Sequence, residues 1–177
     1  MAYFLDRLVR TALLERTAYE EVEADTGATG QAVAVVLLSS LAAGLGAAGI
    51  RGPALGTQAA ITGLALVTWS AWAMLVLQIG ARWMPEPSTR SDAGELLRTI
   101  GFAAAPGLLQ VFGVFPAIST PVFVVAWLWM FAAMVVAIRQ ALDYRSTTHA
   151  LAVTAVGFLI VLAVAIVLGM LIVQPVF

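Results

Sequence analysis

The chain has 177 residues, of which 62% are apolar and 11% are charged, and its formal net charge is −1. Because an ordinary soluble domain carries about 25% charged and about 45–50% apolar residues, a soluble fold of this size could not bury so much apolar surface, so the composition predicts a membrane protein. The chain has no cysteine and one histidine, which excludes disulfides, thiolate nucleophiles, iron–sulfur clusters and sites with several histidine ligands.

The basic residues carry two further indications. All nine of them are arginine, which we interpret as the codon usage of a GC-rich prokaryote. They form no continuous block, and the net charge is close to zero. We therefore expect no nucleic-acid partner.

Residues 1–25, here called the leader, hold nine charged side chains and are not expected to cross the membrane. At 100° per residue, one helix face gathers Phe4, Leu5, Leu8, Val9 and Ala12, opposite Asp6, Arg7 and Arg10. Charges interrupt that face near 14–16, which predicts one bent amphipathic helix or two short ones. The leader is expected to pack on the cytoplasmic ends of the spans. A membrane-surface anchor and a partner-docking surface through Phe4, Leu5, Leu8 and Val9 are the alternatives.

Four stretches without charge follow, at 26–50, 52–81, 99–138 and 146–177. A helix crosses the hydrocarbon core in about 20 residues, so three of these stretches hold one span each. The stretch 99–138 is twice that length, and the two prolines near its middle, at 116 and 121, favour a turn between two spans. We therefore predict an all-α, polytopic bundle, residues 26–177, with five transmembrane helices at about 31–50, 58–80, 99–114, 121–138 and 150–173.

The arginines also predict the orientation. With the N-terminus inside, eight arginines fall on the cytoplasmic side and only Arg51 lies outside, as the positive-inside rule requires. We expect a multi-pass protein of a prokaryotic plasma membrane, with a cytoplasmic N-terminus and an external C-terminus. Asp6 and Arg7 interrupt the apolar start of the chain, so we expect no cleavable signal peptide.

Proline and small residues indicate where the helices bend and meet. Pro106, with Gly101 and Gly107, predicts a kink in the third span, as a packing feature or as the broken helix of a transporter. Close helix contacts, within the bundle or with other subunits, are expected at Ser40, Gly44, Ala48 and Gly63. Tryptophans inside the spans either fill the bundle or face cofactors or lipid of a neighbour.

Catalytic chemistry is not apparent. None of the five predicted spans contains Asp, Glu, Arg, Lys or His, the residues that ion pumps and proton relays require inside the membrane. His149 is expected to be solvated at the membrane surface. No serine has a base and a carboxylate in reach, and no glycine-rich phosphate loop precedes a helix. We predict that the protein is not an enzyme and binds no cofactor or metal.

Four parts of the sequence are similar to those of a known family. The first runs from the leader into the first span and comprises Arg10–Leu14, Tyr19–Val22 and Thr29–Ala32. The others are Gly101–Pro106, the uncharged hairpin with Trp127, and the segment from Ala137–Asp143 through Ser146 and Thr147 to Ala150. In these the chain resembles the Yip family of Ypt/Rab-interacting membrane proteins, in its prokaryotic branch. The likeness extends over nearly the whole chain and implies a non-enzymatic membrane bundle. Arg139 and Asp143, one helical turn apart, would bracket the inner end of the fourth span as an ion pair and are candidate partner contacts.

The resemblance also bears on partners. In eukaryotes the family is implicated in vesicle traffic and binds prenylated small GTPases. This sequence lacks the long cytoplasmic N-terminal domain with Tyr-Gly motifs that accompanies that role, so we expect no small GTPase partner. The expected partners are membrane lipids and other integral membrane subunits.

The sequence is compatible with three functions. The first is a scaffold or accessory subunit that organises other membrane proteins or lipids. The second is a permease or lipid-moving protein for neutral or amphiphilic solutes, in which the kinked third span moves. The third is a membrane-shaping protein that uses the leader as a wedge.

Overall fold

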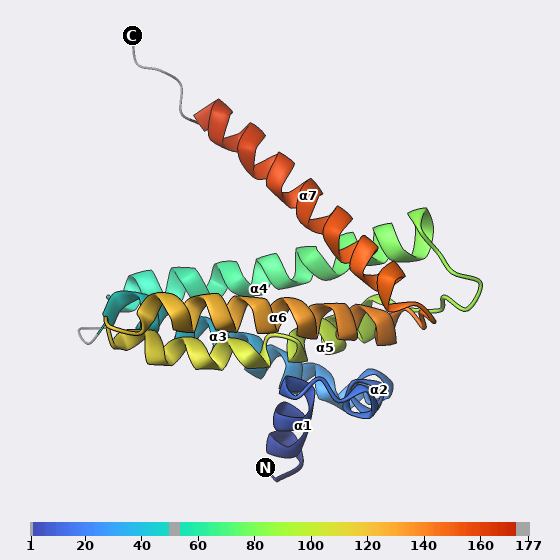
Figure 1. Cartoon of the computed structure of the whole chain (residues 1–177), viewed down its shortest axis with the longest axis horizontal. Coiled ribbons are helices and arrows are strands. Elements are labelled where there is room, and N and C mark those ends of the chain that lie inside the picture. The colour runs from blue at the N-terminus through green and yellow to red at the C-terminus, as the bar shows by residue number, and fades with distance from the viewer. Residues whose placement is uncertain (1, 50–53, 173–177) are drawn as a thin grey trace.

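The computed structural model describes residues 2–49 and 54–172, and in these ranges all regular structure is helical (Figure 1). The helices η1 and η4 are 3₁₀-helices and η3 is a π-helix. In chain order the elements are α1 Ala2–Ala12, α2 Arg16–Ala24, η1 Thr26–Ala28, α3 Thr29–Ala48, α4 Leu55–Leu77, η3 Gln78–Trp83, α5 Ala93–Phe102, η4 Ala105–Val114, α6 Ser119–Ala141 and α7 Thr147–Ile172.

Five helical segments are long and apolar enough to cross a membrane: Thr26–Ala48, Leu55–Trp83, Ala93–Val114, Ser119–Ala141 and Thr147–Val164. The predicted all-α bundle of five spans is therefore confirmed. The third span begins at Ala93, six residues before the predicted start at 99, because Asp92 caps the helix. The Asp92 carboxylate accepts from the Glu95 amide, and the Glu95 carboxylate accepts from the Asp92 amide, each at 2.9 Å. The predicted end of the fifth span at 173 lies outside the described residues.

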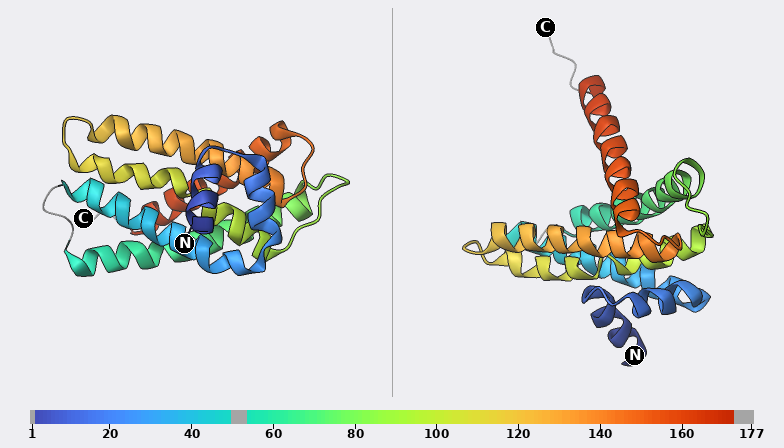
Figure 2. Two further views of the ribbon diagram at one scale, coloured as in Figure 1. Left: turned by 90° about the horizontal axis from the view of Figure 1, so that it is seen from below. Right: turned by 45° about the vertical axis from the view of Figure 1, so that its right-hand side comes forward.

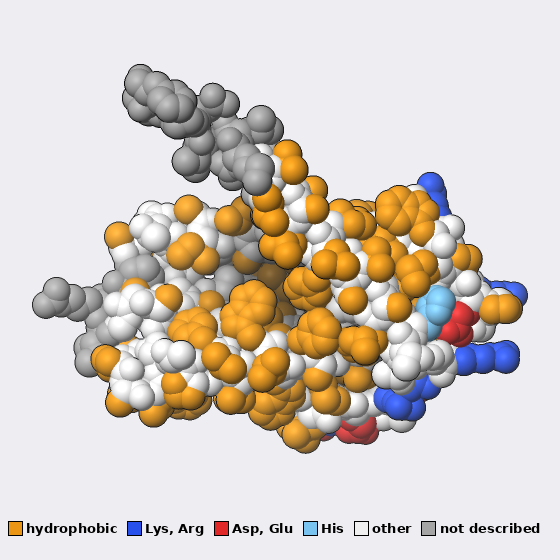
Figure 3. Space-filling view, turned by 45° about the horizontal axis from the view of Figure 1, so that its top comes forward, with side chains coloured by type: hydrophobic (Ala, Val, Ile, Leu, Met, Phe, Trp, Pro, Cys, Tyr) orange, Lys and Arg blue, Asp and Glu red, His pale blue; other side chains and the backbone are white. Residues whose placement is uncertain are grey.

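The first four spans lie side by side, and the leader crosses them on one flank (Figures 1 and 2). The leader consists of two helices, α1 and α2, because the chain turns between Ala12 and Arg16, where Leu14 has a φ of 64°. Charged side chains gather at one end of the molecule, and the rest of the face shown in Figure 3 is predominantly apolar. This separation is what a bilayer demands of a membrane-spanning bundle.

Helix α7 packs on α4 and α6 near its beginning and then diverges from the bundle (Figure 1). Its close contacts include Gly157, which lies against the Trp72 ring, and Phe158, whose ring centroid is 4.9 Å from that of Trp72. The divergence opens an apolar groove of about 700 Å³ between α6 and α7, lined by residues that include Trp127 and Leu159. Trp127 is 60% exposed, so it does not fill the bundle.

The third span is broken in its middle. Helix α5 ends at Phe102, and the chain continues as η4 from Ala105, with Pro106 in its first turn. Proline has no N–H, and its ring clashes with the carbonyl four residues earlier, so an α-helix cannot run through it undisturbed. At the break the carbonyl of Ala104 accepts two hydrogen bonds, one of 2.9 Å from the Gly107 amide and one of 2.7 Å from Ser39 Oγ on α3. A hydroxyl on a neighbouring helix thus adds a second bond to the backbone where the helix is interrupted.

Two glycines flank this break and allow α3 and α6 to approach. A Cβ on Gly101 would lie 2.7 Å from the Ala32 Cβ. A Cβ on Gly107 would lie 3.0 Å from Met130 Sδ and 3.3 Å from the Ser39 Cβ. Gly101, Gly107 and Pro106 therefore lie in the contact between the third span and its neighbours.

The predicted packing positions divide into two groups. Ser40 Oγ lies 3.3 Å from Thr62 Oγ1 on α4, and a Cβ on Gly44 would meet the Gln58 side chain at 2.0 Å. Ala48 and Gly63 are exposed, and nothing lies within 4 Å of a Cβ built on Gly63. The expectation that Ala48 and Gly63 lie at close contacts within the bundle is wrong, because they point away from the neighbouring helices.

We expect two glycine substitutions to have opposite effects. A Cβ at Gly46 would lie 1.9 Å from the carbonyl oxygen of Gln110, a backbone atom that cannot move aside. Gly46→Ala should therefore destabilise the bundle by about 1–3 kcal/mol, as overpacking does. Gly63→Ala, which meets open space, should be neutral or stabilise by up to about 1 kcal/mol through helix propensity. Thermal unfolding of the two detergent-solubilised variants tests this, and equal melting temperatures would contradict it.

Candidate functional site

The leader is held against the spans by hydrogen bonds to the carboxyl-terminal ends of its helices. Arg98 of α5 is buried, and its guanidinium donates from Nε to the carbonyls of Val22 (3.2 Å) and Glu23 (3.1 Å), and from Nη2 to the carbonyl of Glu23. The last carbonyls of a helix lack partners within it, and a cation at that end also interacts favourably with the negative end of the helix dipole. Arg98 therefore caps α2 from the third span.

Helix α1 is capped in the same manner. Trp129 of α6 donates from Nε1 to the carbonyl of Ala12 at 2.7 Å, and the buried Tyr19 hydroxyl donates to the carbonyl of Thr11 at 3.1 Å. These bonds fix the end of α1 against the fourth span, so the tryptophan is partly structural rather than a free contact for a neighbour.

Arg7 joins α1 to the last residue of the leader, Asp25, which directly precedes the first span. Helical periodicity predicts Arg7 on the polar face of the leader, but in the structure it is only 1% exposed. Its Nη1 donates to Asp25 Oδ2 at 2.7 Å, and its guanidinium carbon lies 4.0 Å from the centroid of the Tyr3 ring. The hydrogen bond from Arg7 lowers the pKa of Asp25 below its ordinary value.

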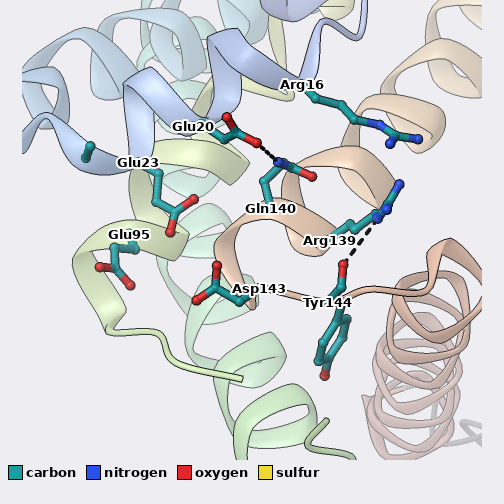
Figure 4. A pocket seen from close by; sticks show the side chains of 9 residues that line it. Arg16, Glu20, Glu23, Glu95, Arg139, Gln140, Asp143 and Tyr144 are labelled. Atoms are coloured by element: carbon teal, nitrogen blue, oxygen red, sulfur yellow. Dashed lines mark hydrogen bonds between the residues drawn. The ribbon is translucent and has the colours of Figure 1, made fainter. Parts of the chain in front are cut away.

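A polar pocket of about 560 Å³ opens where α2 meets the ends of α5 and α6 (Figure 4). Four carboxylates line it, against two arginines, so the pocket has a negative balance. Its lining residues are Arg16, Glu20, Glu23, Ala24, Glu95, Arg139, Gln140, Asp143 and Tyr144.

The two arginines do not neutralise the carboxylates by direct ion pairs in the described part of the chain. Arg139 instead binds the link to α7, donating to the carbonyls of Tyr144 (3.2 Å) and Arg145 (3.1 Å) and to Thr147 Oγ1 (3.0 Å). The expected ion pair between Arg139 and Asp143 is therefore wrong. Asp143 lies just past the end of α6 with a φ of 52°, so its backbone no longer follows the helix that would align the pair.

One carboxylate of the pocket has a strongly perturbed acidity. Burial, together with the negative charges of Asp143, Glu95 and Glu20, raises the pKa of Glu23 to about 7, against the opposing influence of Arg98. Glu20 accepts a hydrogen bond of 2.7 Å from Gln140 Nε2, which joins α2 to α6 across the pocket. The pocket thus holds a carboxyl group that gains or loses its proton near neutral pH.

The remaining polar groups at this end serve the fold. Tyr144 points away from the pocket (Figure 4), and its hydroxyl lies 2.8 Å from the carbonyl of Gly80 and 2.9 Å from that of Met84. His149 Nε2 lies 2.8 Å from the same Met84 carbonyl. Within residues 2–49 and 54–172, no group of three histidine or acidic side chains is placed to hold a metal ion. What the pocket offers is carboxylate oxygens, which form charge-assisted hydrogen bonds with a cationic group.

The residues predicted as partner contacts lie in different places. Arg139 and Asp143 line the pocket. Phe4 and Leu8 pack on the apolar core that the leader shares with the spans, with the Phe4 ring centroid 6.4 Å from that of Phe102, whereas Leu5 and Val9 are more than half exposed. The kink candidates and the packing candidates Ser40 and Gly44 lie inside the bundle, whereas Ala48 and Gly63 are exposed.

Sequence reasoning missed the pocket residues Arg16, Glu20, Glu23, Glu95 and Gln140. The available signal was the grouping of charges at 15–25, 92–98 and 139–145, three segments that the five-span topology brings to one side of the membrane. That grouping predicts proximity of the segments, but it does not say which side chains share a pocket.

The five apolar helices and the polar pocket at one end define a polytopic, all-α membrane protein. The family model that matches the chain is described as Yip1 domain and extends over residues 13–169. The chain therefore belongs to the Yip1 domain family, and the resemblance recognised in the sequence is confirmed at the level of the family. Comparisons with curated proteins and with solved structures gave no match.

The raised pKa of Glu23 predicts how stability depends on pH. The folded protein holds this proton up to about pH 7, whereas the ordinary pKa is 4.5, so the native state binds the proton more tightly than the unfolded one. Stability linked to Glu23 is therefore fully present below pH 4.5 and is lost as the pH rises through 7. Between pH 5.5 and 8 the melting temperature of the detergent-solubilised protein should fall, and it should fall less in Glu23→Gln. Asp6→Asn, an exposed position outside the pocket, should keep the wild-type slope; an unchanged slope in Glu23→Gln would contradict the assignment.

Proposed function

We propose that the protein is a non-enzymatic scaffold or accessory subunit that organises other membrane proteins, and that it docks them through the polar pocket. The observation that carries the proposal is the construction of the pocket: the leader and two spans build it together, and it presents four carboxylates beside two arginines. Arg98 and the Glu20–Gln140 hydrogen bond hold the pocket in shape without any partner.

The charge of the pocket indicates the chemistry of the partner. Cytoplasmic flanks of transmembrane helices are rich in arginine and lysine. A neighbouring membrane protein therefore presents basic side chains at the level where this bundle presents its pocket. Such a flank would place a cationic group between Glu23 and Asp143, where it would relieve the repulsion that raises the pKa of Glu23. Other membrane subunits thus fit the site better than a soluble anionic partner.

We also propose an orientation of the chain in the membrane. Eight of the nine arginines lie in the leader and in the segments at 82–98 and 139–145, and α2 of the leader lies at the end of the bundle that holds those segments (Figure 2). The positive-inside rule then puts the pocket and the N-terminus in the cytoplasm and the C-terminus outside. We retain the plasma membrane of a prokaryote as the proposed location, on the arginine-only usage of the chain.

Transport of solutes receives less support. The hollow beside Pro106 is lined by apolar side chains, among them Leu108, Leu109 and Trp129. Gln110 is only 4% exposed, and its amide nitrogen lies 3.7 Å from Met130 Sδ. The broken third span is thus packed by its neighbours through Ser39 and the flanking glycines, which favours a structural role for the break.

Co-purification from native membranes in mild detergent tests the docking proposal. The wild-type chain should carry a membrane partner in constant stoichiometry. The double variant Glu23→Gln/Asp143→Asn should lose it severalfold, because both negative charges go while side-chain size is kept, and asparagine tolerates the positive φ at position 143. Asp6→Asn serves as the control and should retain the partner. A monodisperse monomer from wild-type membranes would argue against a scaffold, and full retention in the double variant would argue against the pocket.

Single cysteines test the orientation, because the chain has none of its own. Pro87→Cys lies in the exposed loop on the pocket side, and Ala117→Cys lies in the exposed turn at the opposite end of the bundle. A membrane-impermeant maleimide applied to intact cells should label Ala117→Cys, and it should label Pro87→Cys only after the membrane is opened. The reverse pattern would invert the proposed topology.

A further inference from the structure

Helix α1 carries an apolar face that the described part of the chain leaves uncovered. Tyr3, Leu5, Val9 and Leu13 are 56%, 54%, 55% and 65% exposed. Leu5, Val9 and Leu13 are spaced four apart and so form one stripe along the helix. The helix projects from the flank of the bundle with its N-terminal end away from it (Figure 2). In water, a row of large apolar side chains this exposed would be unfavourable.

The contacts of α1 place it beside the apolar length of the spans. Its last residue, Ala12, accepts the hydrogen bond from Trp129, which lies ten residues before Arg139, the charged residue near the end of α6. At 1.5 Å per residue this is about 15 Å along the helix into its charge-free part. On the neighbouring span, Pro106 and Leu109 face Leu8 and Val9 across an apolar hollow of about 220 Å³. The lipid-facing surface of the spans therefore continues directly onto α1.

The charged side chains of α1 are all in ion pairs, as is expected beside lipid. All three of its charged side chains are paired: Arg7 with Asp25 at 2.7 Å, and Arg10 with Asp6 at 3.4 Å as well as with Glu15 and Glu21 at 2.9 Å. Exposed ion pairs in water contribute little stability, but an unpaired charge beside hydrocarbon is expensive. Helix α2 lies on the side of α1 that faces the charged end of the bundle (Figure 2), so these pairs form on the side away from the bilayer centre.

We infer that α1 is a membrane-surface helix that lies in the leaflet on the leader's side, with Leu5, Val9 and Leu13 among lipid acyl chains. The end of one acyl chain occupies the apolar hollow beneath Leu8 and Val9. The attraction is apolar rather than electrostatic, because the leader holds three arginines against six acidic residues and so does not favour anionic headgroups. This inference depends on the membrane spans alone and not on the docking pocket.

Spin labels on single cysteines test the position of α1 in nanodiscs of phosphatidylcholine alone. Val9→Cys and Leu13→Cys should collide severalfold more with oxygen, which dissolves in acyl chains, than with a water-soluble nickel complex. Arg16→Cys, exposed on α2 beside the pocket, serves as the control and should show the reverse preference. Exchanging a quarter of the lipid for phosphatidylglycerol should leave all three ratios unchanged.

Three results would overturn the inference. Labels at Val9 and Leu13 as accessible to the nickel complex as the label at Arg16 would place α1 in water. Protection of these labels from both reagents would show that protein, such as a second copy of the chain, covers the face instead of lipid. A strong dependence on phosphatidylglycerol would make the attraction electrostatic. Because both labelled side chains are exposed, their replacement should not disturb the fold, and monodispersity of each variant verifies this.

Discussion

Backbone carbonyls that lose their helical partners must find donors from elsewhere in the protein when water is scarce, and this requirement organises the molecule. Trp129 donates to Ala12 at the end of α1, and Arg98 donates to Glu23 at the end of α2. At the break in the third span, Ser39 adds a second hydrogen bond to the Ala104 carbonyl, which also accepts from the Gly107 amide. Tyr144 serves carbonyls at the π-helix η3 in the same way. Each of these side-chain donors lies in a different part of the chain from its acceptor, so each of these bonds also joins two parts of the fold.

These bonds explain why the leader is ordered against the bundle rather than free. Tyr19 and Val22 are buried, and Arg98 and Trp129 each hold the end of one leader helix. Burial of the apolar side chains supplies most of the attraction, and the capping bonds set the position. The polar pocket and the uncovered face of α1 are two consequences of this one placement, the first at the charged end of the bundle and the second beside its apolar length.

In the proposals made above, the two surfaces of this Yip1 domain chain address different neighbours. The pocket would offer carboxylates to a cationic partner, and α1 would offer an apolar face to lipid. A scaffold that holds both a protein flank and a leaflet would fix its partner's depth in the membrane as well as its identity. The raised pKa of Glu23 would in addition make the protein contact sensitive to pH near neutrality, since the docking charge exists only in the ionised form.

The number of spans, their approximate ends and the break at Pro106 follow from the amino-acid sequence, because charge in hydrocarbon and proline in a helix are unfavourable whatever the neighbouring structure. The charged residues are grouped between the charge-free stretches, and this grouping also predicts a charged end and an apolar body. The packing of the helices was needed to show that Arg7 is buried, that Arg139 binds the link to α7 rather than Asp143, and that Gly46 rather than Gly63 meets another backbone. These outcomes depend on how helices rotate and cross, and small residues on every face of an apolar helix leave that rotation undetermined until all the helices are packed together.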